Sequence, residues 1–218
     1  MNRYEKTNLQ WNEILKNDNL TIPEGKDSGN EDMNNSLAWL TENTSSIIDF
    51  GCASGSMLFL CSRYGTTSHI GIDLSPQGIA NARTRAKQMP GQQFTFICGG
   101  VDALLSIESA SMDAGILSNI IDNLYPDDAH SVLREIKRIL KPNGKLLVKV
   151  NSYLTPAQIE EYGITPIEGN LLDDGLYLWN NPTEEWDKIL SSYFCIKYYQ
   201  NIYYEEHNQY NRLYQLIR

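Results

Sequence analysis

Residues 47–73 contain two short apolar runs that each end in an aspartate, separated by a segment of helical length. The first run ends at Asp49 and leads into small residues from Gly51 to Gly55, and the second ends at Asp73. An apolar run, a glycine-bearing bend, a helix and a second apolar run are typical of the strand–loop–helix–strand unit that binds nucleotides. The pattern predicts an α/β fold that binds a nucleoside-bearing cofactor.

The spacing of the glycines distinguishes between two kinds of cofactor. A dinucleotide-binding loop has glycines at its first, third and sixth positions, which here are Gly51, Ala53 and Ser56. Two of these three positions do not fit. An acid followed by glycines at alternate positions fits better, because Asp49, Gly51 and Gly55 match and only Ala53 departs. This pattern resembles the first motif of the class I S-adenosylmethionine-dependent methyltransferases.

Further segments extend this resemblance over about residues 36–150. Asp73 stands where the family has its ribose-binding acid, and residues 100–103 are similar to the family's Gly-x-Asp-Ala near the adenine. Residues 111–118 look like its fourth strand, and residues 140–147 look like the turn into its fifth. The resemblance implies a three-layer Rossmann-like methyltransferase fold with a seven-stranded, mostly parallel sheet. Its strand order would be 3-2-1-4-5-7-6, with the last strand antiparallel.

The residue patterns predict the same architecture independently. Alternating strands and helices imply a parallel sheet with helices on both faces. The last two strands, near 194–204 and 212–218, are joined by a short polar loop and should pair antiparallel. Capping and breaker residues place the other strands near 47–50, 69–73, 94–98, 112–118 and 145–150, and the main helices near 55–64, 76–88 and 126–140.

The length of 218 residues suits one methyltransferase domain spanning residues 1–218. Within it we expect an N-terminal helical segment at residues 1–45, which either forms a lid over the cofactor or is a mobile connection. Its second helix should be capped near Asn35. Residues 151–182 are rich in proline and glycine and predict an insertion on the substrate side. Thr183 is expected to cap the helix that follows.

The formal charge of −9 makes a nucleic-acid substrate improbable, because excess carboxylate repels phosphate backbones. A basic cluster at residues 134–145 is better explained by cations that complement a helix end than by a binding patch. The chain has no apolar run of the ~20 residues that span a bilayer, and its first residues lack a secretion signal. Four cysteines without a paired spacing predict reduced thiols in a cytosolic protein. The three histidines are not at metal-ligand spacing, so no metal site is expected. No membrane partner is expected either.

The resemblance also implies the cofactor site for S-adenosyl-L-methionine. A carboxylate at Asp73 can accept two hydrogen bonds from a ribose diol, and Asp102 would accept one from the adenine amino group. Asp49 could act indirectly, as a buried acceptor that fixes the loop. The expected cofactor residues are Asp49, Gly51, Cys52, Ala53, Gly55, Asp73, Leu74, Val101, Asp102, Ala103, Ser118 and Asn119.

The leading hypothesis is therefore transfer of a methyl group to an oxygen or nitrogen of a small-molecule acceptor by in-line displacement. Such an acceptor can require a general base, for which His207 and Asp122 are the candidates. A lone loop histidine such as His207 is more often solvated or structural, and Asp122 is more often a cap before the next helix. Two alternatives remain open, a nicotinamide-dependent oxidoreductase and a non-catalytic cofactor-binding module of the same fold.

Overall fold

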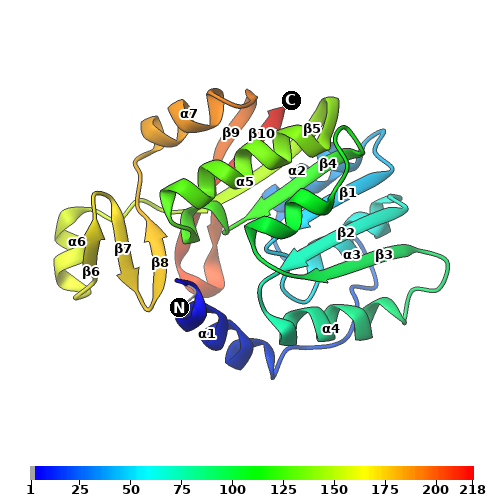
Figure 1. The fold of residues 1–218 in the computed structure, drawn as a ribbon, viewed down its shortest axis with the longest axis horizontal. Helices are drawn as coiled ribbons and strands as arrows, with labels where there is room; N and C mark the ends of the chain where they lie inside the picture. Colours follow the sequence, from blue (N-terminus) through cyan, green and yellow to red (C-terminus); the bar gives the residue numbers. More distant parts are fainter. Residues whose placement is uncertain (1–2) are drawn as a thin grey trace.

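A computed structural model describes residues 3–218 except the side chain of His207, and it contains a central seven-stranded sheet (Figure 1). The strand order is β3-β2-β1-β4-β5-β10-β9, and β10 is antiparallel to both of its neighbours. This arrangement confirms the predicted order. The strands are β1 (Ser46–Phe50), β2 (Ser68–Asp73), β3 (Gln93–Cys98), β4 (Met112–Ser118), β5 (Leu140–Asn151), β9 (Cys195–Tyr204) and β10 (Gln209–Ile217).

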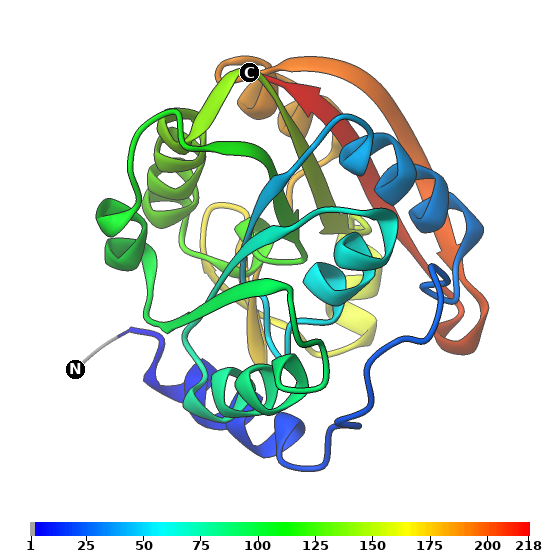
Figure 2. The same ribbon diagram turned by 90° about the vertical axis from the view of Figure 1, so that its right-hand side faces the viewer.

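Helices cover both faces of this sheet. One core cluster joins α5 and α7 to one face, and a second joins α2, α3 and α4 to the other. Helix α1 packs beside α4, as Figures 1 and 2 both show. The helices are α1 (Glu5–Leu15), α2 (Glu31–Thr41), α3 (Ser56–Tyr64), α4 (Pro76–Ala86), α5 (Pro126–Ile139), α6 (Pro156–Glu161) and α7 (Thr183–Ser191), with 3₁₀ turns η1 (Val101–Ser106), η2 (Ile121–Asn123) and η3 (Glu205–His207).

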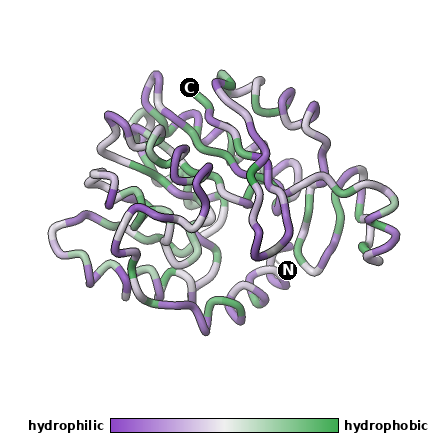
Figure 3. Tube along the Cα trace, turned by 180° about the vertical axis from the view of Figure 1, so that it is seen from behind, coloured by the Kyte–Doolittle hydropathy of each residue, from purple (hydrophilic) through white to green (hydrophobic). Residues whose placement is uncertain are grey.

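Alternation along the central strands explains why both faces are covered. Ile48 belongs to the cluster on the α5 side, and its neighbour Ile47 belongs to the cluster on the α3 side. Successive strand residues point to opposite faces, so a strand that is apolar throughout needs a layer on each side. Each such fully buried side chain contributes about 1.5–3 kcal/mol. Figure 3 shows the hydrophobic residues gathered along the central strands, whereas the β9–β10 hairpin is largely hydrophilic near its turn.

Two predicted helix caps are wrong. The side chain of Ser75 accepts a hydrogen bond from the backbone N–H of Gly78 and caps α4. Helix α2 is capped by Asn30 instead of Asn35, because it begins five residues earlier than the sequence suggested. Thr183 is the first residue of α7 and makes no cap hydrogen bond. Its hydroxyl contacts Tyr199 and Arg212 instead.

A small antiparallel sheet occupies the segment expected to be an insertion. Strands β6 (Thr165–Glu168), β7 (Leu171–Asp174) and β8 (Leu176–Trp179) pair in the order β6-β7-β8. Figure 1 shows this sheet beyond the edge of the α5 layer, with α1 below it. The ring of Tyr177 contacts the ring of Tyr4, and Lys6 forms an ion pair with Asp173. The insertion and the N-terminal segment therefore contact each other.

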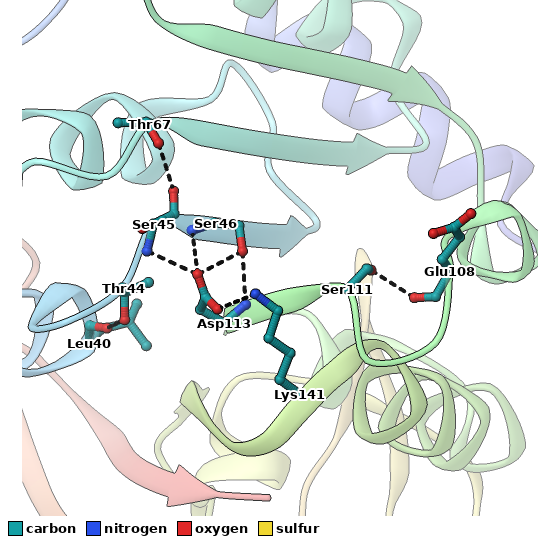
Figure 4. A network of polar contacts seen from close by, with 9 residues as sticks. All are labelled: Leu40, Thr44, Ser45, Ser46, Thr67, Glu108, Ser111, Asp113 and Lys141. Atoms are coloured by element: carbon teal, nitrogen blue, oxygen red, sulfur yellow. Dashed lines mark hydrogen bonds and ion pairs between the residues drawn. The ribbon is translucent and has the colours of Figure 1, made fainter.

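The basic cluster is divided among separate structural contacts. Lys141 forms an ion pair with Asp113, whose carboxylate also accepts hydrogen bonds from the backbone N–H groups of Ser45 and Ser46 (Figure 4). Lys145 donates to the backbone oxygens of Trp39 and Glu42 at the end of α2. These cations therefore connect β1, β4, β5 and α2 at the amino-terminal edge of the sheet.

No helix among the described residues 3–218 has the length and apolar character needed to cross a membrane.

Candidate active site

A cavity of about 1380 Å³ lies at the carboxyl ends of β1, β2, β4 and β5. This is the position where open parallel sheets bind ligands, because the strand order reverses between β1 and β4. The loop after β1 forms one wall. Helix α1, the β6–β8 sheet and the start of β10 also contribute lining residues, including Trp11, Leu176 and Asn211.

The loop from Gly51 to Gly55 takes a left-handed backbone at three positions. The φ angles are +84° at Gly51, +46° at Ala53 and +81° at Gly55. A side chain at Gly51 would approach the Cγ1 atom of Ile120 to 2.9 Å, so glycine is needed there for space as well as for conformation. Ala53 occupies the second glycine position of the expected motif, at the cost of an unfavourable left-handed alanine.

Asp73 connects this loop to helix α4. One carboxylate oxygen accepts a hydrogen bond from the Ala53 N–H at 2.8 Å, and the other accepts one from the Ser75 N–H at 2.7 Å. Burial raises the pKa of Asp73, and these two hydrogen bonds act in the opposite direction. Each carboxylate oxygen has a second lone pair, so Asp73 can still accept hydrogen bonds from a ligand in the cavity that it lines.

Asp49 lines the same cavity and is 2 % exposed. Its Oδ1 atom is buried and receives no hydrogen bond from any residue between 3 and 218. Burial, together with the nearby charge of Asp73, raises the pKa of Asp49 to about 8. The expected role of Asp49 in fixing the loop stays a prediction, and the Oδ1 atom takes no part in it in this structure. An unpartnered acceptor here favours a ligand that carries a hydrogen-bond donor.

Three asparagines, Asn119, Asn151 and Asn211, lie side by side at the same edge of the sheet and are called here the asparagine row. Asn119 follows β4, Asn151 ends β5, and Asn211 pairs with Asn151 in the register of β10. The Nδ2 of Asn119 donates to the Oδ1 of Asn151 at 2.9 Å. All three line the cavity. The row therefore presents carboxamide groups to the same cavity as the loop from Gly51 to Gly55.

Asp122 contacts the asparagine row through Asn151 and does not line the cavity. Its Oδ2 atom accepts hydrogen bonds from the backbone N–H of Asn151 at 2.7 Å and from its Nδ2 at 2.8 Å. The Arg212 guanidinium donates to the backbone oxygen of Asn151 from the other side. Asp122 is 1 % exposed, and its two hydrogen bonds restrict the position of Asn151. Its role as a base stays a prediction.

The remaining predicted residues divide into three groups. His207 belongs to η3, and its side chain lies outside the part of the chain that the structure describes. Gly55 and Ala103 do not line the cavity: Gly55 precedes α3 as its cap, and Ala103 packs against Gly99. The other predicted cofactor residues do line it, namely Asp49, Gly51, Cys52, Ala53, Asp73, Leu74, Val101, Asp102, Ser118 and Asn119.

Several lining residues were not predicted from the sequence. Tyr4 and Tyr177 contact each other and Tyr125 through their ring edges. Tyr4 also accepts a hydrogen bond from the backbone N–H of Tyr125 and donates one to Asp128. Both Tyr4 and Tyr177 line the cavity. They come from segments without a motif, so only their convergence in the fold could identify them.

Comparison with known proteins bears on what this cavity does. Residues 48–148 match the family described as "Methyltransferase domain". This region is a methyltransferase domain. The predicted family resemblance is thus confirmed, and the family match covers the loop after β1, Asp73 and the strands up to β5.

Two relatives that are named as methyltransferases agree with this assignment. The methyltransferase domain is similar to a ribosomal protein L11 methyltransferase of Pasteurella multocida, at 28% identity over 61% of this chain and 45% of that protein. It is also similar to an arsenite methyltransferase of Aquipseudomonas alcaligenes, at 33% identity over 46% of this chain and 31% of that protein. The chain therefore spans less than half the length of these relatives.

A structural neighbour covers nearly the whole chain. The N-methyltransferase NodS from Bradyrhizobium japonicum WM9, solved with S-adenosyl-L-homocysteine, superposes with a TM-score of 0.69 over 98% of this chain and 99% of its own. The identity is 16%. At this identity the likeness concerns the fold, which extends through the N-terminal and C-terminal segments outside the family match.

Proposed function

We propose that the protein binds S-adenosyl-L-methionine in this cavity and transfers its methyl group to a small-molecule acceptor. The observation that carries the proposal is the convergence of Asp73 with the left-handed loop from Gly51 to Gly55. A carboxylate at this place suits a ribose diol. Glycines let the backbone of the bend approach a ligand closely, which suits the methionine part of the same molecule.

The lining residues fit this cofactor by the chemistry of their donors and acceptors. Asp73 has lone pairs left for the ribose hydroxyls, and the exposed carboxylate of Asp102 is available to an adenine amino group. The unpartnered Oδ1 of Asp49 suits the ammonium group of the methionine part. The bound cofactor would supply an electrophilic methyl group on a sulfonium, which needs no specialised nucleophile in the protein.

The chain's own residues then hold the acceptor. The asparagine row lies next to the loop after β1, where an acceptor must meet the methyl group. Asp122 and Arg212 restrict the position of Asn151 through hydrogen bonds on both sides. We propose that no buried base acts in this reaction, so that a proton leaves directly to solvent.

We also propose that residues 1–45 act as a lid within the single domain 1–218 and that residues 151–182 form the substrate side. Trp11 and Tyr177 line the cavity from these two segments. The Tyr177 hydroxyl donates to the backbone oxygen of Arg3, and Lys6 pairs with Asp173. These contacts support a closed arrangement in which a small molecule could be enclosed.

A protein acceptor is the second candidate, because the relative from Pasteurella multocida is a ribosomal protein L11 methyltransferase. The arsenite methyltransferase among the relatives supports a small acceptor instead. The enclosure of the cavity by α1 and the β6–β8 sheet favours the small molecule, because a protein side chain would have to pass both segments.

Two measurements test the proposal. Calorimetry should show micromolar binding of S-adenosyl-L-homocysteine and no comparable binding of NADH, and NADH binding alone would favour the oxidoreductase alternative. Labelled methyl groups should then be transferred to a member of a metabolite panel, with purified ribosomal protein as the competing acceptor. Cofactor binding without any transfer would indicate a non-catalytic module.

The four free cysteines support our further proposal of a cytosolic location.

A further inference from the structure

The cavity is strongly acidic. Its lining includes six aspartates, whereas Arg3 is the only cationic side chain that the described residues contribute. Arg3 is already paired with Asp127 and Asp128 at 2.8 and 2.6 Å. The lining therefore keeps an excess of negative charge, even with Asp49 protonated and a singly cationic cofactor bound. The six aspartates are Asp18, Asp49, Asp73, Asp102, Asp128 and Asp174.

A second, independent observation lies in the asparagine row. The Oδ1 atom of Asn211 is buried and has no hydrogen-bond partner among residues 3–218, and the residue as a whole is 7 % exposed. Asn211 lines the cavity next to Asn151. A buried acceptor without a donor costs about 1–3 kcal/mol. Such an atom therefore indicates a ligand with a donor at this end of the cavity.

The orientation of Asn119 adds a second acceptor atom. Asp122 accepts from the Nδ2 of Asn151, so the Oδ1 of Asn151 turns toward Asn119 and accepts from its Nδ2. This chain of hydrogen bonds leaves the Oδ1 of Asn119 as the atom available to a ligand, since no residue in the described part of the chain donates to it. Asn119 and Asn211 thus present two acceptors on either side of Asn151.

Several aromatic rings complete the enclosure. Tyr4, Trp11, Tyr153, Tyr177 and Tyr210 line the cavity. The face of an aromatic ring attracts a cation by about 0.5–2 kcal/mol, and it also packs against apolar groups. Negative charge, unpartnered acceptors and aromatic rings all favour the same kind of ligand.

We propose that the methyl acceptor is a small-molecule amine that enters the cavity as an ammonium ion, an inference that rests on the proposed methyltransferase function. An amine offers two or more N–H donors for Asn119 and Asn211, whereas a hydroxyl offers one and a carboxylate offers none. The ammonium first releases one proton to water. The freed nitrogen lone pair forms the N–C bond while the C–S bond breaks, and the pair of electrons from that bond remains on sulfur.

Calorimetry with the protein saturated by S-adenosyl-L-homocysteine tests the inference. The probes are phenethylamine, 2-phenylethanol and phenylacetate, which share a ring and differ in charge and donor number. At about pH 7.5 the amine is protonated, because alkylamines titrate near the pKa of lysine. Phenethylamine should bind at least about tenfold more tightly than either other probe, as one extra charged hydrogen bond implies. Equal binding of the three probes, or preference for phenylacetate, would overturn the inference.

A matched pair of variants localises the effect. Asn211→Leu should weaken phenethylamine binding about tenfold and leave the affinity for S-adenosyl-L-homocysteine unchanged. Asn201→Leu on β9 is the control, because Asn201 is exposed and does not line the cavity. If Asn211→Leu binds phenethylamine as tightly as the control, the asparagine row does not accept hydrogen bonds from the amine and the inference fails. If S-adenosyl-L-homocysteine does not bind the parent protein, the proposed function itself fails.

Discussion

The Asp73 carboxylate accepts a hydrogen bond from the Ala53 N–H at 2.8 Å, which joins the end of β2 to the loop after β1. Its other oxygen accepts from the Ser75 N–H at the start of α4. The same side chain therefore organises the loop and faces the cavity. A substitution at Asp73 should affect both the fold of the loop and the affinity for the cofactor.

The first prediction concerns this double role. Asp73→Ala should lower the affinity for S-adenosyl-L-homocysteine by roughly 1.5–3 kcal/mol, the contribution of hydrogen bonds to a charged group. It should also lower the melting temperature, because two backbone N–H groups lose their acceptor. Asp73→Asn keeps the shape but only one acceptor oxygen, so its effect on both quantities should be smaller. Unchanged cofactor affinity in Asp73→Ala would remove this residue from the site.

The second prediction separates crowding from backbone strain at Gly51. Gly51→Ala introduces a left-handed alanine and a methyl group 2.9 Å from Ile120. Gly91→Ala is the control, because Gly91 has φ +91° and nothing within 4 Å of the added carbon. Urea unfolding should show a loss of about 1–2 kcal/mol in both variants from strain, and a larger loss at Gly51. Only Gly51→Ala should weaken cofactor binding. Equal free energies of unfolding in the two variants would mean that Ile120 moves aside at no cost.

The third prediction concerns the pH dependence of stability that arises from Asp49. Its pKa is about 8 in the folded protein and about 3.9 in an unfolded chain. The folded state therefore binds more protons between pH 4 and 8, so the contribution of Asp49 to stability declines as the pH rises through that range. Asp49→Asn removes this contribution. The melting temperature of Asp49→Asn minus that of the parent protein should increase as the pH rises from about 4 to about 8. A difference that does not change with pH would contradict the raised pKa of Asp49.

The fourth prediction has the opposite sign. Burial opposes ionisation of Asp113, but hydrogen bonds from Lys141, Ser45 and Ser46 prevail and lower its pKa to about 2. Its stabilisation should therefore be present above about pH 4 and be lost as the pH falls toward 2. Asp113→Ala should cost about 1–3 kcal/mol at neutral pH in urea unfolding. Glu13→Gln is the control, because it breaks an exposed ion pair with Lys16 and should cost less than about 0.5 kcal/mol. If the two variants lose similar amounts of stability, the Asp113 ion pair is an ordinary surface pair.

The sheet could be predicted because its signals are local. An apolar run that ends in an acid, followed by a bend of small residues, fixed β1 and β2 within one residue of their observed starts. The antiparallel pairing of the last two strands followed from the short polar loop between them, whereas the strand order followed from the family resemblance. In contrast, Asn35 was a plausible cap for α2, yet the helix begins at Glu31 and the Asn30 side chain accepts the cap hydrogen bond from the Met33 N–H.

The site was predictable only where it coincides with the motif. The loop residues and Asp73 line the cavity as expected, because both follow directly from parallel strands. Tyr4, Tyr177 and Asn211 line it through long-range contacts, which carry no local pattern. Asp122 illustrates the same limit, since its sequence position suggested a base or a cap, and only the fold shows its bonds to Asn151.

The most direct test of the account is a crystal structure of the protein grown with S-adenosyl-L-homocysteine. The account predicts density for the nucleoside between the Gly51–Gly55 loop and the Asp73 carboxylate, with the ribose hydroxyls within hydrogen-bond distance of Asp73. Density at another position, or a loop closed by its own side chains in crystals soaked at saturating concentration, would contradict it.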